Sequence, residues 1–270
     1  MGYGLDAAPI GPRSKAVDQG RAACGRSVRR RPFSARHAAI ITFKTQGRIM
    51  QHKVALLGAT GFVGGHILTE ALSRPELDIT AVVRNPAALV AHDHLTATAG
   101  DVFDVPALTE ALRGHDTVIH AFHPGRTSSP DEVYDQSVAG HQAIIDATRA
   151  AGVPRLVCVG GAASLMTPEG REYIDSSHWD KEFDPYRNSI LGTRALYYML
   201  KDMTDLDWVF LAPSAWLRPG ERTGVFRTSA NDMLFAADGT SRISLEDYSM
   251  VLIDEVVTPA HHRERFTVGY

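Results

Sequence analysis

The sequence has little cysteine, no long apolar run and, after its first fifty residues, little positive charge. Its 270 residues include two cysteines, Cys24 and Cys158, which excludes a disulfide framework and a cysteine-rich zinc site. No apolar run approaches the roughly 20 residues of a membrane span, so we expect no membrane partner and a cytoplasmic protein. A composition of 44% hydrophobic and 22% charged residues is typical of a globular chain.

Charge is distributed unevenly along the chain. Residues 1–49 carry ten basic and two acidic side chains, whereas the remainder carries 18 basic and 29 acidic ones. A nucleic-acid interface needs clustered basic side chains to displace counterions. The acidic remainder therefore argues against nucleic acid as a partner of the folded domain.

Residues 1–49 are rich in Gly, Ala, Arg and Ser and lack clear hydrophobic periodicity, which predicts a largely disordered basic arm. Three interpretations remain open: an Arg-rich targeting segment, a basic tail around residues 29–31, or upstream coding sequence that precedes the true start at Met50. We favour the third, because Met50 leads directly into the first predicted strand. Residues 50–270 are expected to form a single domain.

A strand, a glycine-rich turn and a helix follow one another from residue 53. Residues 53–57 form an apolar run typical of a central parallel strand, and apolar positions recur at helical spacing as far as Ser73. Glycines between them would allow a tight turn, close approach to a pyrophosphate and close packing of the helix on the strand. The pattern predicts dinucleotide binding by Gly58, Thr60, Gly61, Phe62, Val63 and Gly64.

The second predicted strand, residues 78–83, ends at Arg84, 20 residues after Gly64. An NAD site would place Asp or Glu here, against the ribose hydroxyls. An arginine fork can instead hold a 2′-phosphate through charge-assisted hydrogen bonds. We therefore expect NADP(H) as the cofactor, with NAD(H) the less favoured alternative.

Strands and helices continue to alternate along the chain. This order predicts an α/β fold, a Rossmann-type doubly wound parallel sheet with ligands beyond the carboxyl ends of its strands. A small C-terminal substrate-binding region is expected at about residues 165–190 and 213–245. The further predicted strands are residues 95–100, 116–121, 155–159, 207–213 and 266–268, and the further helices include residues 105–113 and 131–151.

These motifs resemble the atypical short-chain dehydrogenase/reductases, and most of all the biliverdin-IXβ/flavin-reductase-like and NmrA-like branch. The likeness spans roughly residues 52–270. It implies that Gly58, Gly61 and Gly64 contact the pyrophosphate and that Arg84 meets the 2′-phosphate. It also implies that Asp101 and Val102 lie near adenine and that Ala121 and Phe122 pass beside the ribose. The segments that carry it are residues 58–64, 83–85, 100–104, 159–165, 212–214 and 219–224.

Reductases of the wider superfamily use a serine after the fifth strand and a Tyr-x-x-x-Lys pair on the next helix. Ser164 matches the serine and Tyr186 is the best tyrosine candidate, but Ile190 stands where the lysine would be. Without that cation a tyrosine keeps a pKa near 10 and is a slow acid at pH 7. His123 is an alternative proton donor because histidine titrates near neutral pH. A purely structural histidine bonded to the backbone is the interpretation we favour.

The predicted strand 207–213 is followed by Ser214 and Trp216, which we expect to meet the substrate; Trp216 could stack on a flat conjugated ring, or simply pack in the core. His261 and His262 lack carboxylates at ligand spacing, so no metal site is expected.

The leading hypothesis is an NADPH-dependent reductase of a small conjugated acceptor such as a flavin or quinone, acting as a monomer or homodimer. The alternative is a non-catalytic NADP(H)-binding redox sensor of NmrA type.

Overall fold

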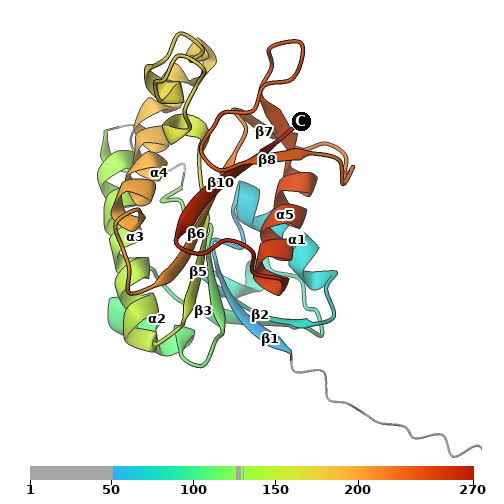
Figure 1. Cartoon of the computed structure of the whole chain (residues 1–270). Coiled ribbons are helices and arrows are strands. Elements are labelled where there is room, and N and C mark those ends of the chain that lie inside the picture. Colours follow the sequence, from blue (N-terminus) through green and yellow to red (C-terminus); the bar gives the residue numbers. More distant parts are fainter. Residues whose placement is uncertain (1–50, 126–128, 130) are drawn as a thin grey trace, which may run out of the picture. The chain divides into compact units, whose positions relative to one another are not determined.

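An eight-stranded sheet lies at the centre of the computed structural model, which describes residues 51–125, 129 and 131–270 (Figure 1). The spatial order of its strands is β3-β2-β1-β4-β5-β6-β10-β8, and all neighbouring strands pair in parallel except β8 and β10. The strands are β1 (His52–Leu57), β2 (Leu77–Val83), β3 (Leu95–Ala99), β4 (Thr117–His120), β5 (Arg155–Val159), β6 (Asp207–Pro213), β8 (Arg227–Ser229) and β10 (Glu264–Gly269). A separate parallel pair joins β7 (Trp216–Arg218) to β9 (Arg242–Ser244).

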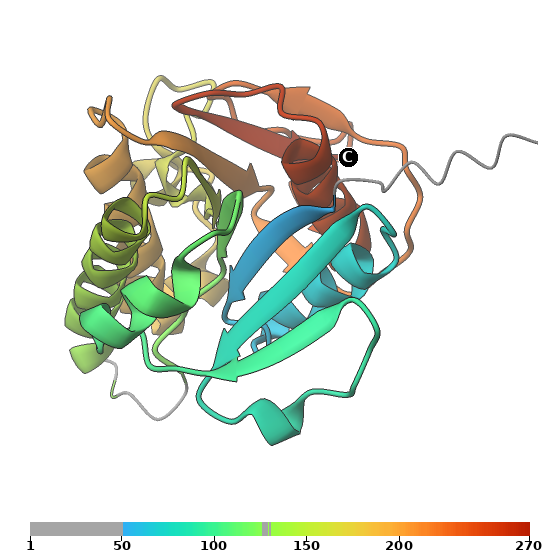
Figure 2. The same ribbon diagram turned by 90° about the horizontal axis from the view of Figure 1, so that it is seen from below.

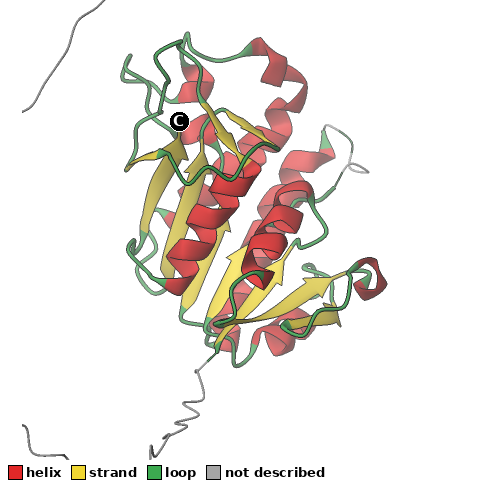
Figure 3. Ribbon diagram, turned by 90° about the vertical axis from the view of Figure 1, so that its right-hand side faces the viewer, coloured by secondary structure: helices red, strands yellow, loops and turns green. Residues whose placement is uncertain are grey.

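Helices cover both faces of the sheet (Figures 2 and 3). One face packs against α1 (Phe62–Leu72) and α5 (Leu245–Val257), and the other against α2 (Val105–Leu112), α3 (Glu132–Ala151) and α4 (Arg187–Leu200). This arrangement confirms the predicted α/β doubly wound fold.

Strand β1 shows why both faces need a cover. Val54 and Leu56 belong to the core beneath α1 and α5, while Ala55 and Leu57 belong to the core beneath α2, α3 and α4. All four side chains are fully buried. Burial on both faces makes the strand an unbroken apolar run, as the sequence predicted.

The order in which the chain adds strands to the sheet reverses at β1. From β1 it moves outward to β2 and β3, then returns to place β4 on the other side of β1. The loops after β1 and β4 consequently diverge, and a crevice opens at their carboxyl ends. This is where the ligand was expected.

The expectations for residues 1–49 lie outside the described residues. Within the described part of the chain, no helix combines the length and apolar character needed to cross a membrane.

Candidate functional site

A cleft of about 1440 Å³ opens at the carboxyl ends of the parallel strands. It is formed by the loops that follow β1 to β5, together with the start of α4. Its volume exceeds the roughly 300–1,000 Å³ typical of a pocket for one small molecule. Ten of the eleven predicted cofactor residues line it: Gly58, Thr60, Gly61, Phe62, Val63, Arg84, Asp101, Val102, Ala121 and Phe122.

Two glycines allow the strands and the first helix to approach closely. Gly58 has a φ of +89°, and a Cβ atom there would lie 2.6 Å from the carbonyl carbon of Ala121. A Cβ atom on Gly64 would lie 2.7 Å from the carbonyl carbon of Gly58. Real Cβ atoms do not approach backbone this closely, so both positions require glycine. Gly64, the eleventh predicted residue, therefore acts through packing and lies behind the cleft surface.

The N-terminus of α1 is built to receive an anion. Gly61 is its N-cap and supplies no side-chain oxygen. The Gly65 N–H donates to the Gly61 carbonyl at 2.9 Å, which leaves the N–H groups of residues 62–64 without acceptors in the helix. Phe62 and Val63 line the cleft, so these dipoles are available to a pyrophosphate.

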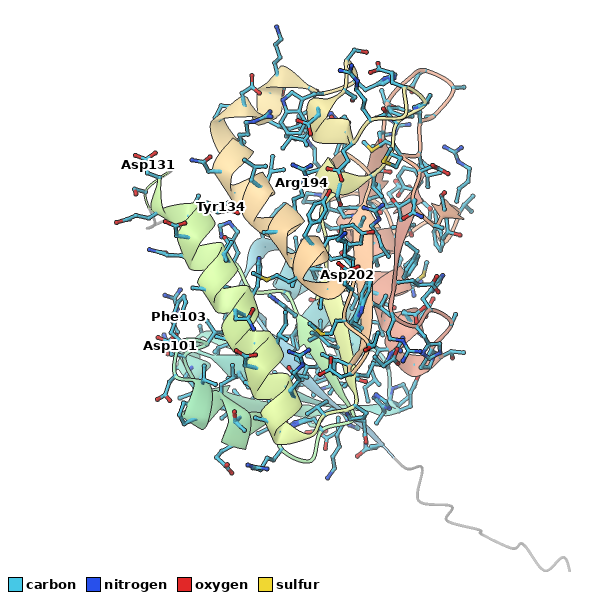
Figure 4. The ribbon with its side chains drawn as sticks, turned by 60° about the vertical axis from the view of Figure 1, so that its left-hand side comes forward. Asp101, Phe103, Asp131, Tyr134, Arg194 and Asp202 are labelled. Carbon is cyan, nitrogen blue, oxygen red and sulfur yellow. The ribbon has the colours of Figure 1, made fainter. Side chains whose placement is uncertain are left out.

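Arg84 follows β2 at the far end of the cleft. Its side chain is exposed and makes no ion pair or hydrogen bond with another described residue. The next residue, Asn85, uses its side-chain oxygen to accept the Ala87 N–H at 3.2 Å. Asp101 and Phe103, visible at one edge in Figure 4, complete this end. The glycine cradle, the open helix N-terminus and the unpaired cation together fit a dinucleotide.

His141 lines the inner wall of the cleft and pairs with the buried His120. The His120 Nδ1 atom accepts the Phe122 N–H at 3.2 Å, and His120 Nε2 lies 2.9 Å from His141 Nδ1. This pattern assigns the His120 proton to Nε2 and the His141 proton to its own Nε2. Burial lowers the pKa of His120 well below its usual value and that of His141 to about 4. His141 Nε2 is near the backbone of Gly192, which raises the pKa slightly, but it has no well-formed hydrogen bond to a described residue.

His123 lies closer to the mouth of the cleft. Its Nδ1 atom accepts the Gly125 N–H at 3.0 Å, and its Nε2 atom lies 2.8 Å from the Ser189 hydroxyl oxygen. Partial burial lowers the pKa of His123 and thereby favours the neutral imidazole. His123 and Ser189 both line the cleft.

Tyr186 lines the cleft and is 64% exposed. It is the N-cap of α4, so Ile190 lies one turn further along that helix. The nearest cation in this pattern, Arg194, forms an ion pair with Glu172 and stacks over Tyr198. The structure thus supplies no lysine-like partner for Tyr186 among the described residues, as the sequence indicated.

Three of the five predicted catalytic and substrate residues are not among the described residues that line the cleft. Ser164 is 1% exposed, and its hydroxyl accepts a hydrogen bond from Arg265 Nη1 at 2.9 Å. Ser214 is also buried and donates to the Val268 carbonyl at 3.1 Å. Trp216 packs against Phe183, with ring centroids 4.5 Å apart.

The expected substrate and catalytic contacts of Ser164, Ser214 and Trp216 therefore need correction. Both hydroxyls are held inside the protein by hydrogen bonds, and the Trp216 ring is further covered by the Arg218 guanidinium 3.8 Å from its centroid. Of the predicted substrate region, it is residues 184–189 that reach the cleft. Ser189 was not among the predicted site residues, although its position three residues after Tyr186 places it one helical turn further along the chain.

His261 and His262 have carboxylate partners that sequence spacing did not reveal. His261 Nδ1 lies 2.7 Å from Glu255, and His262 Nδ1 lies 3.0 Å from Asp207. Both carboxylates also bind Arg155, whose guanidinium occupies the space between them. No set of three or more His, Cys, Asp or Glu side chains in the described ranges is arranged to hold a metal ion.

A family model described as NAD(P)H-binding matches residues 58–256. The chain belongs to this NAD(P)H-binding family. The match begins at the first glycine of the cradle and extends almost to the end of α5. It confirms the family resemblance predicted from the glycine, Arg84 and Asp101 segments.

Three similar proteins share nearly their whole length with the chain. The uncharacterized protein YwnB of Bacillus subtilis is 34% identical over 222 residues, which are 80% of this chain and 97% of YwnB. A Bacteroides thetaiotaomicron structure provisionally assigned as an epimerase is 39% identical, with a TM-score of 0.73 over 82% of this chain and 97% of that one. A Streptococcus pneumoniae structure provisionally assigned as an NADH-flavin reductase is 27% identical, with a TM-score of 0.68 over 81% and 99% of the two chains.

Proposed function

We propose that the protein is an NADPH-dependent oxidoreductase that transfers hydride to a small conjugated acceptor such as a flavin or quinone. The observation that carries this proposal is the single cleft that joins the glycine cradle, the open N-terminus of α1 and the unpaired Arg84. Its volume of about 1440 Å³ leaves room for a second molecule beside a dinucleotide.

The preference for a 2′-phosphate rests on Arg84 and Asn85. A free guanidinium can bind a phosphate through two charge-assisted hydrogen bonds. Recognition of NAD(H) would instead need a carboxylate at the end of β2. Asn85 is neutral there, and its side-chain oxygen already caps the turn at Pro86–Ala88.

Each end of the cleft has a distinct task in this mechanism. The N–H groups at the start of α1 would hold the pyrophosphate, while Asp101 and Val102 would border the adenine and Ala121 and Phe122 the ribose; all four side chains line the cleft. The bound nicotinamide supplies the hydride. The protein contributes chiefly by holding donor and acceptor together and by excluding water, because no Tyr–Lys pair lies in the cleft as described.

The test is turnover of NADPH by purified protein in the presence of a flavin or a naphthoquinone. Sustained loss of NADPH absorbance, in proportion to acceptor and protein concentration, is the expected result. Tight NADPH binding with no turnover of either acceptor would remove the reductase activity and leave a cofactor-binding protein. The NADH-flavin reductase assignment of the Streptococcus pneumoniae structure supports testing flavin first.

A further inference from the structure

A hydroxyl group faces the cleft beside the end of β4. Ser189 lies in the first turn of α4, and its Oγ atom is 2.8 Å from His123 Nε2. The two residues come from segments 66 positions apart in the sequence and both line the cleft. Neither residue belongs to the glycine cradle.

The direction of this hydrogen bond is fixed by a neighbouring one. Because His123 Nδ1 accepts the Gly125 N–H, a neutral imidazole carries its proton on Nε2. Nε2–H therefore donates to Ser189 Oγ. The serine hydroxyl keeps its own hydrogen and can donate it to another oxygen, and the bond that it accepts strengthens it as a donor.

Ser189 is also placed on the correct face of α4. Tyr186, Ser189 and Thr193 follow one another at spacings of three and four residues, and all three line the cleft. Thr193 donates to the Ser189 backbone carbonyl at 3.4 Å, so its hydroxyl is engaged within the helix. On this face, and within the described part of the chain, Ser189 is the hydroxyl that accepts a hydrogen bond from a histidine and keeps its own hydrogen free to donate.

We propose that Ser189 is a catalytic residue whose hydroxyl donates a hydrogen bond to the carbonyl oxygen of the acceptor, and that the acceptor class is a planar conjugated carbonyl compound, a quinone or enone. This inference rests on the proposed hydride transfer from NADPH. His123 is the positioning residue that holds the hydroxyl and orients its hydrogen.

The electron balance follows from this arrangement. Hydride forms a new C–H bond at a carbon conjugated to the carbonyl, and the π electron pair moves onto the carbonyl oxygen. The resulting enolate oxygen receives the Ser189 hydrogen bond as its negative charge develops. Water then supplies one proton to the enolate, so that NADPH and a proton are consumed per acceptor reduced.

The first test compares two acceptors in wild type and Ser189→Ala. One is 1,4-naphthoquinone, and the other is methylene blue, a planar dye that accepts hydride but has no carbonyl oxygen. We expect about a 100-fold loss of kcat and of kcat/KM with the quinone, because a donor to a developing oxyanion is removed. The background-corrected rate with methylene blue should fall far less than the quinone rate, so that the ratio of the two rates drops by a large factor. Equal losses with both acceptors, or no loss with the quinone, would overturn the proposal.

Control variants separate this role from general disturbance of the cleft. Thr193→Val alters the neighbouring hydroxyl on the same helix face, which is engaged within the helix, and should lose far less of the quinone rate than Ser189→Ala. Ser189→Thr retains a hydroxyl and should recover most of the rate lost in the alanine variant. If Thr193→Val loses as much activity as Ser189→Ala, the effect belongs to the helix and the proposal for Ser189 is wrong.

The positioning role of His123 has its own readout. His123→Gln keeps an N–H donor near the Nε2 position and should retain more of the quinone rate than His123→Ala. The ratio of the quinone rate to the methylene blue rate should fall more in His123→Ala than in His123→Gln, and equal ratios in the two variants would exclude the positioning role. A wild type that binds NADPH but reduces no quinone would overturn this inference and leave the cofactor site intact, whereas failure to bind NADPH would overturn the proposed function itself.

Discussion

The carbonyl group of Gly58 occupies the space that a side chain on Gly64 would need. A Cβ atom at residue 64 would lie 2.7 Å from the Gly58 carbonyl carbon and 3.3 Å from the Ala59 nitrogen. Backbone on both sides leaves no flexible group that could move aside. The turn after β1 and the start of α1 can therefore pack this closely only because residue 64 has no side chain.

Gly64→Ala should consequently disrupt the cradle, while Gly65→Ala should not. At residue 65 a Cβ atom would meet only the Ala59 carbonyl oxygen at 3.7 Å, an ordinary contact. Alanine is also the better helix former by roughly 0.5–1 kcal/mol. We expect Gly65→Ala to raise the melting temperature slightly and to retain NADPH binding, and Gly64→Ala to lower both. Calorimetry and a nucleotide titration measure the two effects, and similar behaviour of the two variants would contradict the packing argument.

The buried pair His120–His141 should make the protein less stable in mild acid. Burial lowers the pKa of His141 to about 4, whereas the unfolded chain has a value near 6.5. Unfolded protein thus binds more protons in this range, and the free energy of unfolding falls as pH drops from about 6.5 towards 4. A shift of this size corresponds to at most about 3 kcal/mol. His141→Gln should flatten the pH dependence of unfolding between pH 6.5 and 5; an unchanged slope would exclude His141 as its source.

Tyr186→Phe should retain most of any reductase turnover. The side chain is 64% exposed, Ile190 stands in place of the usual lysine, and Arg194 is paired with Glu172. Steady-state kinetics with NADPH and a quinone would check this. Loss of nearly all turnover would restore a tyrosine-based proton relay and count against the Ser189 mechanism.

Local patterns in the sequence were sufficient to predict the fold and the NAD(P)H-binding family, while the roles given to individual cofactor residues stay predictions. The strand before Gly58, the helix after it and Arg84 at the end of β2 are each defined by neighbours within a few residues. The two-sided burial of Val54 to Leu57 makes such a strand recognisable without tertiary information.

The substrate end could not be predicted in the same way, because its contacts join distant segments. His123 meets Ser189 across 66 residues, and Arg265 meets Ser164 across 101. The second contact turns the expected catalytic serine into an internal acceptor, and nothing near Ser164 in the sequence signals this. Trp216 is similar, since Phe183 from a distant segment packs against the ring expected to bind substrate.

The most direct test of the account is binding of NADPH and NADH to wild type and to Arg84→Ala, measured by thermal unfolding with each nucleotide. A ligand that binds only the folded state raises the melting temperature by mass action. Arg113→Ala, which removes an exposed arginine on a surface pair with Glu110, is the matched control. We predict a large shift of the wild type with NADPH, a small one with NADH, and loss of that difference only in Arg84→Ala. Equal shifts of the wild type with both nucleotides, or no shift with either, would contradict the assignment of this cleft to NADPH.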